Sequence, residues 1–191
     1  MDDFRLYFSI GWGHIISIDS LDHILFVVAL SAIYLFRDWR KILILVTAFT
    51  IGHSLTLALS VYDIVRINEK LVELLIPVTI FITALFNFFQ KDYSPKKLQL
   101  NYFFALFFGL IHGLGFANSI RFMLAKSESI GWPLLSFNLG LEAGQIVIVF
   151  LILLFCYSAV SFLKLPQKIW VYLLSSIALI FSIQMIIERL N

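Results

Sequence analysis

Cysteine and charged residues are both scarce in this chain of 191 residues. The single cysteine, Cys156, excludes a disulfide within the chain and leaves the redox compartment undetermined. Only 14% of the residues are Asp, Glu, Lys or Arg, whereas soluble domains carry about 25%. The net charge of +2 is too small to indicate a nucleic-acid partner, and the positive residues lie in short connectors. The first residues, Met-Asp-Asp, are acidic, so we expect no cleavable signal peptide.

Long apolar runs dominate the chain instead. Hydrophobic residues make up 61% of it and the mean hydropathy is +0.95. A membrane helix needs about 20 mostly apolar residues, so we predict an all-α, polytopic membrane helix bundle that forms a single domain over residues 1–191. Residues 4–18 are apolar but interrupted by Gly11 and Gly13, which favours an interfacial or re-entrant segment. Six transmembrane helices are predicted after it, at about 20–36, 42–63, 71–90, 99–124, 133–162 and 169–188.

The connectors alternate in charge along the chain. Residues 37–41 and 91–97 each carry three positive residues, and residues 164–168 carry two, whereas the connectors between them are less basic. Positive residues concentrate in cytoplasmic loops. The pattern therefore predicts that both termini lie on the outer side of the membrane.

Ionisable residues lie inside these apolar runs, where they are costly and usually mark a site. His14, Asp19, Asp22 and His23 cluster at the start of the first run. His53 and His112 each lie near the middle of a later span, and Glu142 lies in the outer half of the fifth span. The inner half offers only hydroxyls and Asn87. We therefore expect the histidines to converge on one site that opens to the outer side.

Spacing places further polar residues beside these groups. Thr50, His53 and Ser54 share one helix face, and Asn138, Glu142 and Gln145 share another. Hydrogen bonds that join two helices would explain the amides of Asn138 and Gln145. A neutral amide would serve that purpose at position 142 with a smaller desolvation cost than the carboxylate of Glu142. Gly109 and Gly113 form a small-residue face beside His112, which is typical of close helix packing.

Imidazole and carboxylate ligands together suit zinc, nickel, cobalt, iron or manganese, whereas copper(I) prefers cysteine or methionine. The acids Asp19, Asp22 and Glu142 would ligate the metal or orient the histidines. We expect His14 to stay outside the ligand set, because the glycines around it indicate a flexible turn.

Four stretches resemble the HupE/UreJ family of small bacterial membrane proteins, especially its short Bacteroidetes-type members. The matching stretches are Asp22-His23-Ile-Leu-Phe, Phe49-Thr-Ile-Gly-His53-Ser, Phe108-Gly-Leu-Ile-His112-Gly-Leu-Gly-Phe and Phe137-Asn-Leu-Gly-Leu-Glu142-Ala-Gly-Gln145.

The resemblance implies a nickel or cobalt permease of the bacterial inner (cytoplasmic) membrane. It assigns the metal-ligand role to His23, His53, His112, Asp22 and Glu142, surrounded by His14, Asp19, Asn138, Gln145 and Ser54. One feature departs from dedicated nickel/cobalt transporters. Seven residues separate His14 from Asp22, whereas those transporters have a shorter gap.

Three functions are compatible with these residues. The leading hypothesis is a permease for a divalent cation (nickel, cobalt or zinc) that works by alternating access. The second is an intramembrane zinc hydrolase with Glu142 as general base, acting on a lipid or a lipidated substrate. The third is an accessory subunit whose polar residues only join helices. The expected partners are membrane lipid and the metal ion, and a homo-oligomer stays open.

Overall fold

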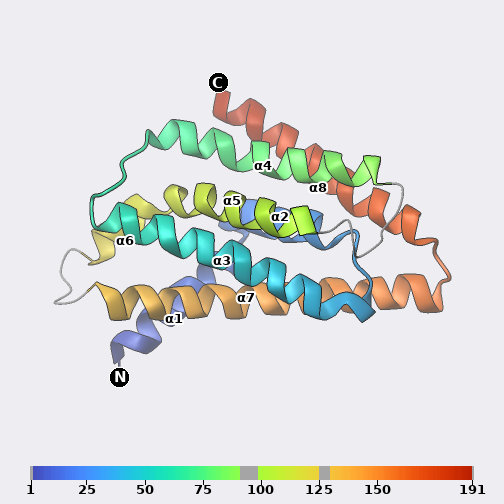
Figure 1. Ribbon diagram of the computed structural model, residues 1–191, viewed down its shortest axis with the longest axis horizontal. Coiled ribbons are helices and arrows are strands. Elements are labelled where there is room, and N and C mark those ends of the chain that lie inside the picture. Colours follow the sequence, from blue (N-terminus) through green and yellow to red (C-terminus); the bar gives the residue numbers. More distant parts are fainter. Residues whose placement is uncertain (1, 91–98, 125–129, 191) are drawn as a thin grey trace.

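The computed structural model describes residues 2–90, 99–124 and 130–190, and this part of the chain is entirely helical, as predicted (Figure 1). Short 3₁₀ segments cover Ile18–Ser20 and Phe36–Asp38, and a π-helical turn, Ser158–Phe162, extends α7. The helices are α1 (Asp2–Ile16), α2 (Leu21–Ser31), α3 (Trp39–Val61), α4 (Glu69–Phe89), α5 (Gln99–Gly115), α6 (Ala117–Leu124), α7 (Gly131–Tyr157) and α8 (Gln167–Leu190).

The predicted six spans are not confirmed. Within the described residues, four helical segments are long and apolar enough to cross a membrane: Phe36–Val61, Glu69–Phe89, Gly131–Phe162 and Gln167–Leu190. A fifth arises if α1 and α2 form one span, bent by 66° between them. The predicted first span is mostly α2, whose 11 residues reach only about 16 Å at 1.5 Å per residue. The predicted fourth span is divided between α5, a shorter apolar helix, and α6.

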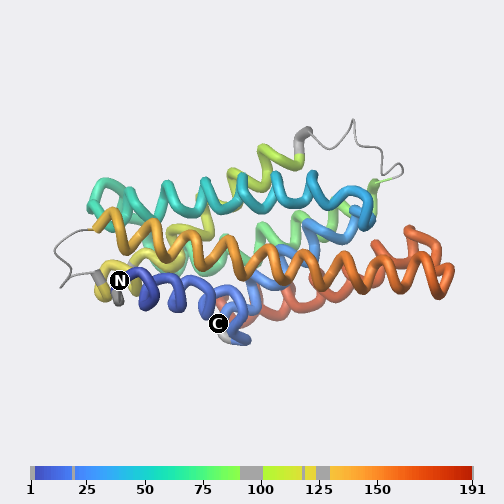
Figure 2. The backbone as a smooth tube through the Cα atoms, turned by 90° about the horizontal axis from the view of Figure 1, so that it is seen from below, coloured from blue at the N-terminus to red at the C-terminus, as the bar shows by residue number. Residues whose placement is uncertain are grey.

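Three helix pairs make up most of the bundle: α3 with α5, α1 with α7, and α4 with α8. Figures 1 and 2 both show α1 lying along the first half of α7. The first two pairs meet at glycines, because a side chain there would collide with the neighbouring backbone. A Cβ at Gly113 would overlap the carbonyl oxygen of His53, and one at Gly11 would overlap that of Phe137.

These contacts confirm the small-residue face predicted on α5 and correct the expectation for the first segment. Gly11 and Gly13 lie inside a continuous helix rather than in a flexible turn. Gly11 lets the backbone of α1 pack directly against that of α7. This contact positions the end of α1, which carries His14, at the centre of the bundle.

Many large apolar side chains face outward, as lipid contact requires. Phe86, Phe103 and Phe155 are exposed on α4, α5 and α7, whereas histidines, hydroxyls and amides lie inside. This exposure of many large apolar side chains differs from the surface of a soluble protein. Together with the candidate spans, it shows a multi-pass membrane protein.

Candidate metal centre

The break between α1 and α2 brings the first two histidines together. His14 lies in the last turn of α1 and His23 in the first turn of α2. In one continuous helix, nine residues would separate them by about 13 Å. The 66° bend instead brings their rings edge to face at 4.8 Å between centroids.

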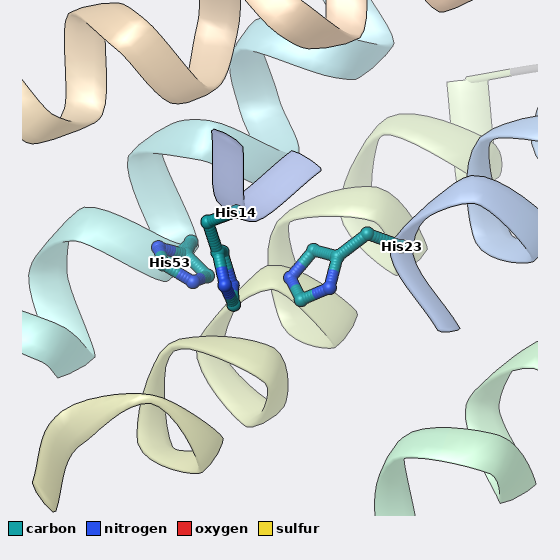
Figure 3. Close-up of side chains that lie close together, drawn as sticks. All are labelled: His14, His23 and His53. Carbon is teal, nitrogen blue, oxygen red and sulfur yellow. The ribbon is translucent and has the colours of Figure 1, made fainter. Parts of the chain in front are cut away.

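The other two histidines reach the same place from α3 and α5. The ring of His23 lies 6.0 Å from that of His53 and 5.1 Å from that of His112, centroid to centroid. Ring nitrogens of His14, His23 and His53 all lie within 4.8 Å of one another. Figure 3 shows the ring of His14 between those of His53 and His23, with the three side chains on separate helices. The predicted convergence of the histidines is therefore present.

The carboxylate of Asp22 determines which nitrogen of His23 faces the cluster. Asp22 Oδ1 accepts a hydrogen bond from His23 Nδ1 at 2.9 Å and another from the His23 backbone N–H at 2.8 Å. An acceptor at Nδ1 keeps the proton there, so Nε2 carries the lone pair. This nitrogen is buried and has no partner among the described residues. A carboxylate that holds one imidazole nitrogen while the other binds metal is a common arrangement at metal sites.

The hydroxyl of Thr79 contacts one ring nitrogen of His112, as Asp22 does for His23. The Thr79 hydroxyl donates to the carbonyl oxygen of Ile76 at 2.7 Å. Its second contact, 3.1 Å to His112 Nε2, is then one in which the imidazole donates. The lone pair of His112 is therefore on Nδ1, which is buried without a partner in the described part of the chain.

His53 is 0% exposed, and neither of its ring nitrogens has a partner at good hydrogen-bond geometry within the described residues, although the side chain of Asn138 lies beside the ring. His14 Nε2 is likewise buried and unpaired, and its Nδ1 has only a long contact of 3.4 Å to the hydroxyl of Ser20. A buried polar group without a partner costs about 1–3 kcal/mol. Three of these imidazoles, those of His14, His23 and His53, bring ring nitrogens close enough together to bind a metal ion.

A metal ion fits this donor set. Nitrogen ligands at about 2.1 Å from a tetrahedral metal lie about 3.4 Å apart. The nitrogens of His14, His23 and His53, at up to 4.8 Å, are thus somewhat wider apart than a bound metal requires, and side-chain rotation can close the difference. Aromatic rings surround them, with Phe116 at 4.2 Å from His14 between centroids.

A cavity of about 120 Å³ leads to this cluster. His14, Asp22, His23 and His112 are among the residues that line it, whereas His53 is fully buried and is not one of them. Glu73 of α4 and Arg189 of α8 also line it and form an ion pair at 2.6 Å between Oε2 and Nη1.

The chain matches the family described as HupE / UreJ protein over residues 1–189. It belongs to the HupE/UreJ family. In the comparisons with curated proteins and with solved structures, nothing matches it significantly.

Several residues singled out from the sequence of this HupE/UreJ protein lie away from the cluster. Glu142 Oε1 accepts a hydrogen bond from the Thr47 hydroxyl at 2.8 Å, and Gln145 Oε1 accepts one from the Thr50 hydroxyl at 2.9 Å. Both bonds join α7 to α3. Glu142 is not among the metal-binding groups that the described residues bring together.

The remaining predicted neighbours are divided. Asn138 lies beside His53, and its amide nitrogen donates to the carbonyl oxygen of Leu134 at 2.8 Å. Ser54 is half-buried on α3. The side chain of Asp19 lies outside the described residues.

Sequence reasoning missed two contributors to this HupE/UreJ site. His14 was expected outside the ligand set, yet it lies between His23 and His53. Thr79 was not considered, although it orients His112. The polar spacing of Thr79, Thr83 and Asn87 at four-residue intervals on α4 was the available signal for Thr79. The bend that brings His14 inward had none.

Proposed function

We propose that this HupE/UreJ protein is a permease for a divalent transition metal of the nickel/cobalt class, which acts as a single membrane domain. One observation carries the proposal: unpaired imidazole nitrogens from three helices meet within 4.8 Å at the end of a cavity. The family is associated with nickel and cobalt uptake, and imidazole is a suitable ligand for both metals.

The geometry supports a ligand set led by histidine. In this proposal His23 and His53 supply nitrogens as expected and His14 supplies a third, while the ring of His112 lies beside them, 5.1 Å from that of His23. In this proposal Asp22 acts through His23, which it orients. Glu142, whose carboxylate bonds Thr47, stabilises the joint between α3 and α7 instead of binding the ion.

The charge of the cluster suits a transported ion better than a permanently held one. Asp22 is the carboxylate in contact with it, so a divalent ion on neutral imidazoles keeps a net charge of about +1 in a medium of low dielectric. A transport site must bind strongly enough for the ion to enter and weakly enough for it to leave. A site of several thiolates or carboxylates would hold the ion more firmly.

The direction of opening follows from the connectors. The cavity is lined by Glu73 near the start of α4 and Arg189 near the end of α8. The charge pattern of the sequence assigns these helix ends to the outer side. In this proposal the ion enters from outside, in the bacterial inner membrane.

Uptake into proteoliposomes tests the proposal. We expect nickel or cobalt uptake by the native protein and loss of uptake in His53→Ala. Ser31→Ala is the control, because it removes a buried hydroxyl from α2 outside the cluster. Equal uptake by His53→Ala and the native protein would refute the transport role. Equilibrium dialysis of both proteins then shows whether they bind the metal at all.

A further inference from the structure

A second cavity lies in the same bundle, and the histidine cluster does not use it. It measures about 150 Å³ and lies between α2, α4 and α5. Most of its lining is apolar and comprises Leu30 near the end of α2, Ile33 just after that helix, Ile82 and the outward-facing Phe86 of α4, and Phe104 and Phe108 of α5. Asn87 on α4 and Asn101 on α5 add amide groups. Among the residues that the structure describes, no histidine and no carboxylate lines it.

The same three helices line both cavities. On α2, His23 faces the first cavity and Leu30 the second, with Phe26 between them on the same helix face. On α5, His112 lines the first cavity, and Phe108, four residues earlier, lines the second. The two cavities are therefore consecutive along one line through the bundle.

Aromatic rings separate them. The ring of Phe26 lies 6.0 Å from that of Phe108 and 4.8 Å from that of Phe49, centroid to centroid. On the other side, Phe26 and Phe49 lie 5.3 Å and 5.1 Å from the ring of His112. All three phenylalanines are buried. A constriction of apolar side chains excludes water and hydrated ions until it opens.

A row of polar groups on α4 passes this constriction. Thr79 contacts His112 on the side of the first cavity. One turn later, the hydroxyl of Thr83, which lines the second cavity, donates to the Thr79 carbonyl oxygen at 2.8 Å. Asn87, another turn on, donates its two amide hydrogens to Ala29 and Ser175. Asn87 itself lines the second cavity.

We propose that the second cavity is the far half of the ion path. It takes a hydrated divalent cation on amide and hydroxyl oxygens, and Phe26, Phe49 and Phe108 close it from the histidine cluster. This inference rests on the proposed transport function. Neutral oxygen ligands bind a hydrated transition metal much more weakly than imidazoles do. The cavity therefore suits release on the side opposite to the histidine cavity.

Cysteine accessibility tests this path, because the chain has a single cysteine to remove. In a Cys156→Ala background, Thr83→Cys reports on the second cavity and Met185→Cys on the first. Each variant is treated with a membrane-impermeant maleimide in right-side-out and in inside-out vesicles. We expect the two positions to react from opposite faces, each at least about tenfold faster from its own face, because an alternate state is at most about 10% populated.

The aromatic constriction is tested in the same background. Phe108→Ala removes a ring between the cavities, so Thr83→Cys should also react from the face that labels Met185→Cys. Phe103→Ala is the matched control, because this residue is exposed on the same helix and its loss should leave both faces distinct. An unchanged labelling pattern in Phe108→Ala would overturn the role of the rings.

Other outcomes separate the path from the transport function. If Thr83→Cys reacts from the same face as Met185→Cys in the intact protein, the second cavity is not the far half of a path. If only a lipid-soluble maleimide labels it, the cavity faces lipid and the inference is likewise overturned. Labelling from opposite faces, combined with no metal binding in dialysis, would uphold two opposed cavities and refute the metal as their cargo.

Discussion

The substitution Asp22→Asn distinguishes the two roles that this aspartate can have. In the structure, Asp22 contacts the cluster only through His23, whose Nδ1 and backbone N–H both donate to Oδ1. The amide oxygen of Asn can still accept from Nδ1, so the ring keeps its orientation and loses only the charge beside it. Loss of such an orienting group weakens metal binding about tenfold to a hundredfold, or about 1.4–2.8 kcal/mol.

Isothermal titration of the detergent-solubilised protein with nickel measures this change. We expect Asp22→Asn to bind with the native stoichiometry and reduced affinity, whereas His23→Ala loses the site. If Asp22→Asn abolished binding as completely as His23→Ala, Asp22 would be a direct ligand, as the sequence first suggested. Native affinity in Asp22→Asn would show that the hydrogen bond to His23 has no role in metal binding.

Three further predictions follow from the packing and chemistry of the site. Gly113→Ala should force α5 away from α3 beside His53, which lowers the free energy of unfolding by about 1–3 kcal/mol and weakens metal binding. Gly131→Ala is the control: the position has open space around it, so thermal melts should show unchanged stability and titrations unchanged metal affinity. Because burial opposes protonation of the clustered imidazoles, nickel affinity should hold between about pH 7.5 and about pH 5.5 and fall only at more acidic pH, where a protonated imidazole has no lone pair for the ion; binding already lost at about pH 5.5 would argue against this buried histidine site. Glu142→Gln should keep nickel affinity within about threefold, since the amide oxygen can still accept from Thr47 and keep the bond between α3 and α7; loss of the site would make Glu142 a ligand.

Some of the site could be predicted because it depends on local pattern. Histidines in the middle of apolar runs are costly enough to indicate a site without any coordinates. The spacing of Gly109 and Gly113 predicts a close helix contact, and α5 does meet α3 there. Helix faces were also predictable from spacing, and Thr50, Asn138 and Gln145 are indeed buried.

Other features depended on contacts between distant segments. The six predicted spans are not confirmed, because hydropathy does not show where α5 ends and α6 begins, or that α2 has only 11 residues. Glu142 shares a helix face with Asn138 and Gln145, but its carboxylate lies opposite Thr47. A shift of one helical turn along this face determines whether a carboxylate lies at the histidine cluster or at the contact between α7 and α3.

By itself, the sequence determined that this is a membrane protein of buried helices with imidazoles near the centre, because hydropathy and helical period are properties of neighbouring residues. Only the tertiary structure decided which imidazoles meet. The 66° break places His14 against His23, and backbone contact at Gly11 and Gly113 sets the depth of α1 and α5. A bend angle and the closest approach of two helices arise from contacts between segments far apart in the chain, so no local pattern contains them.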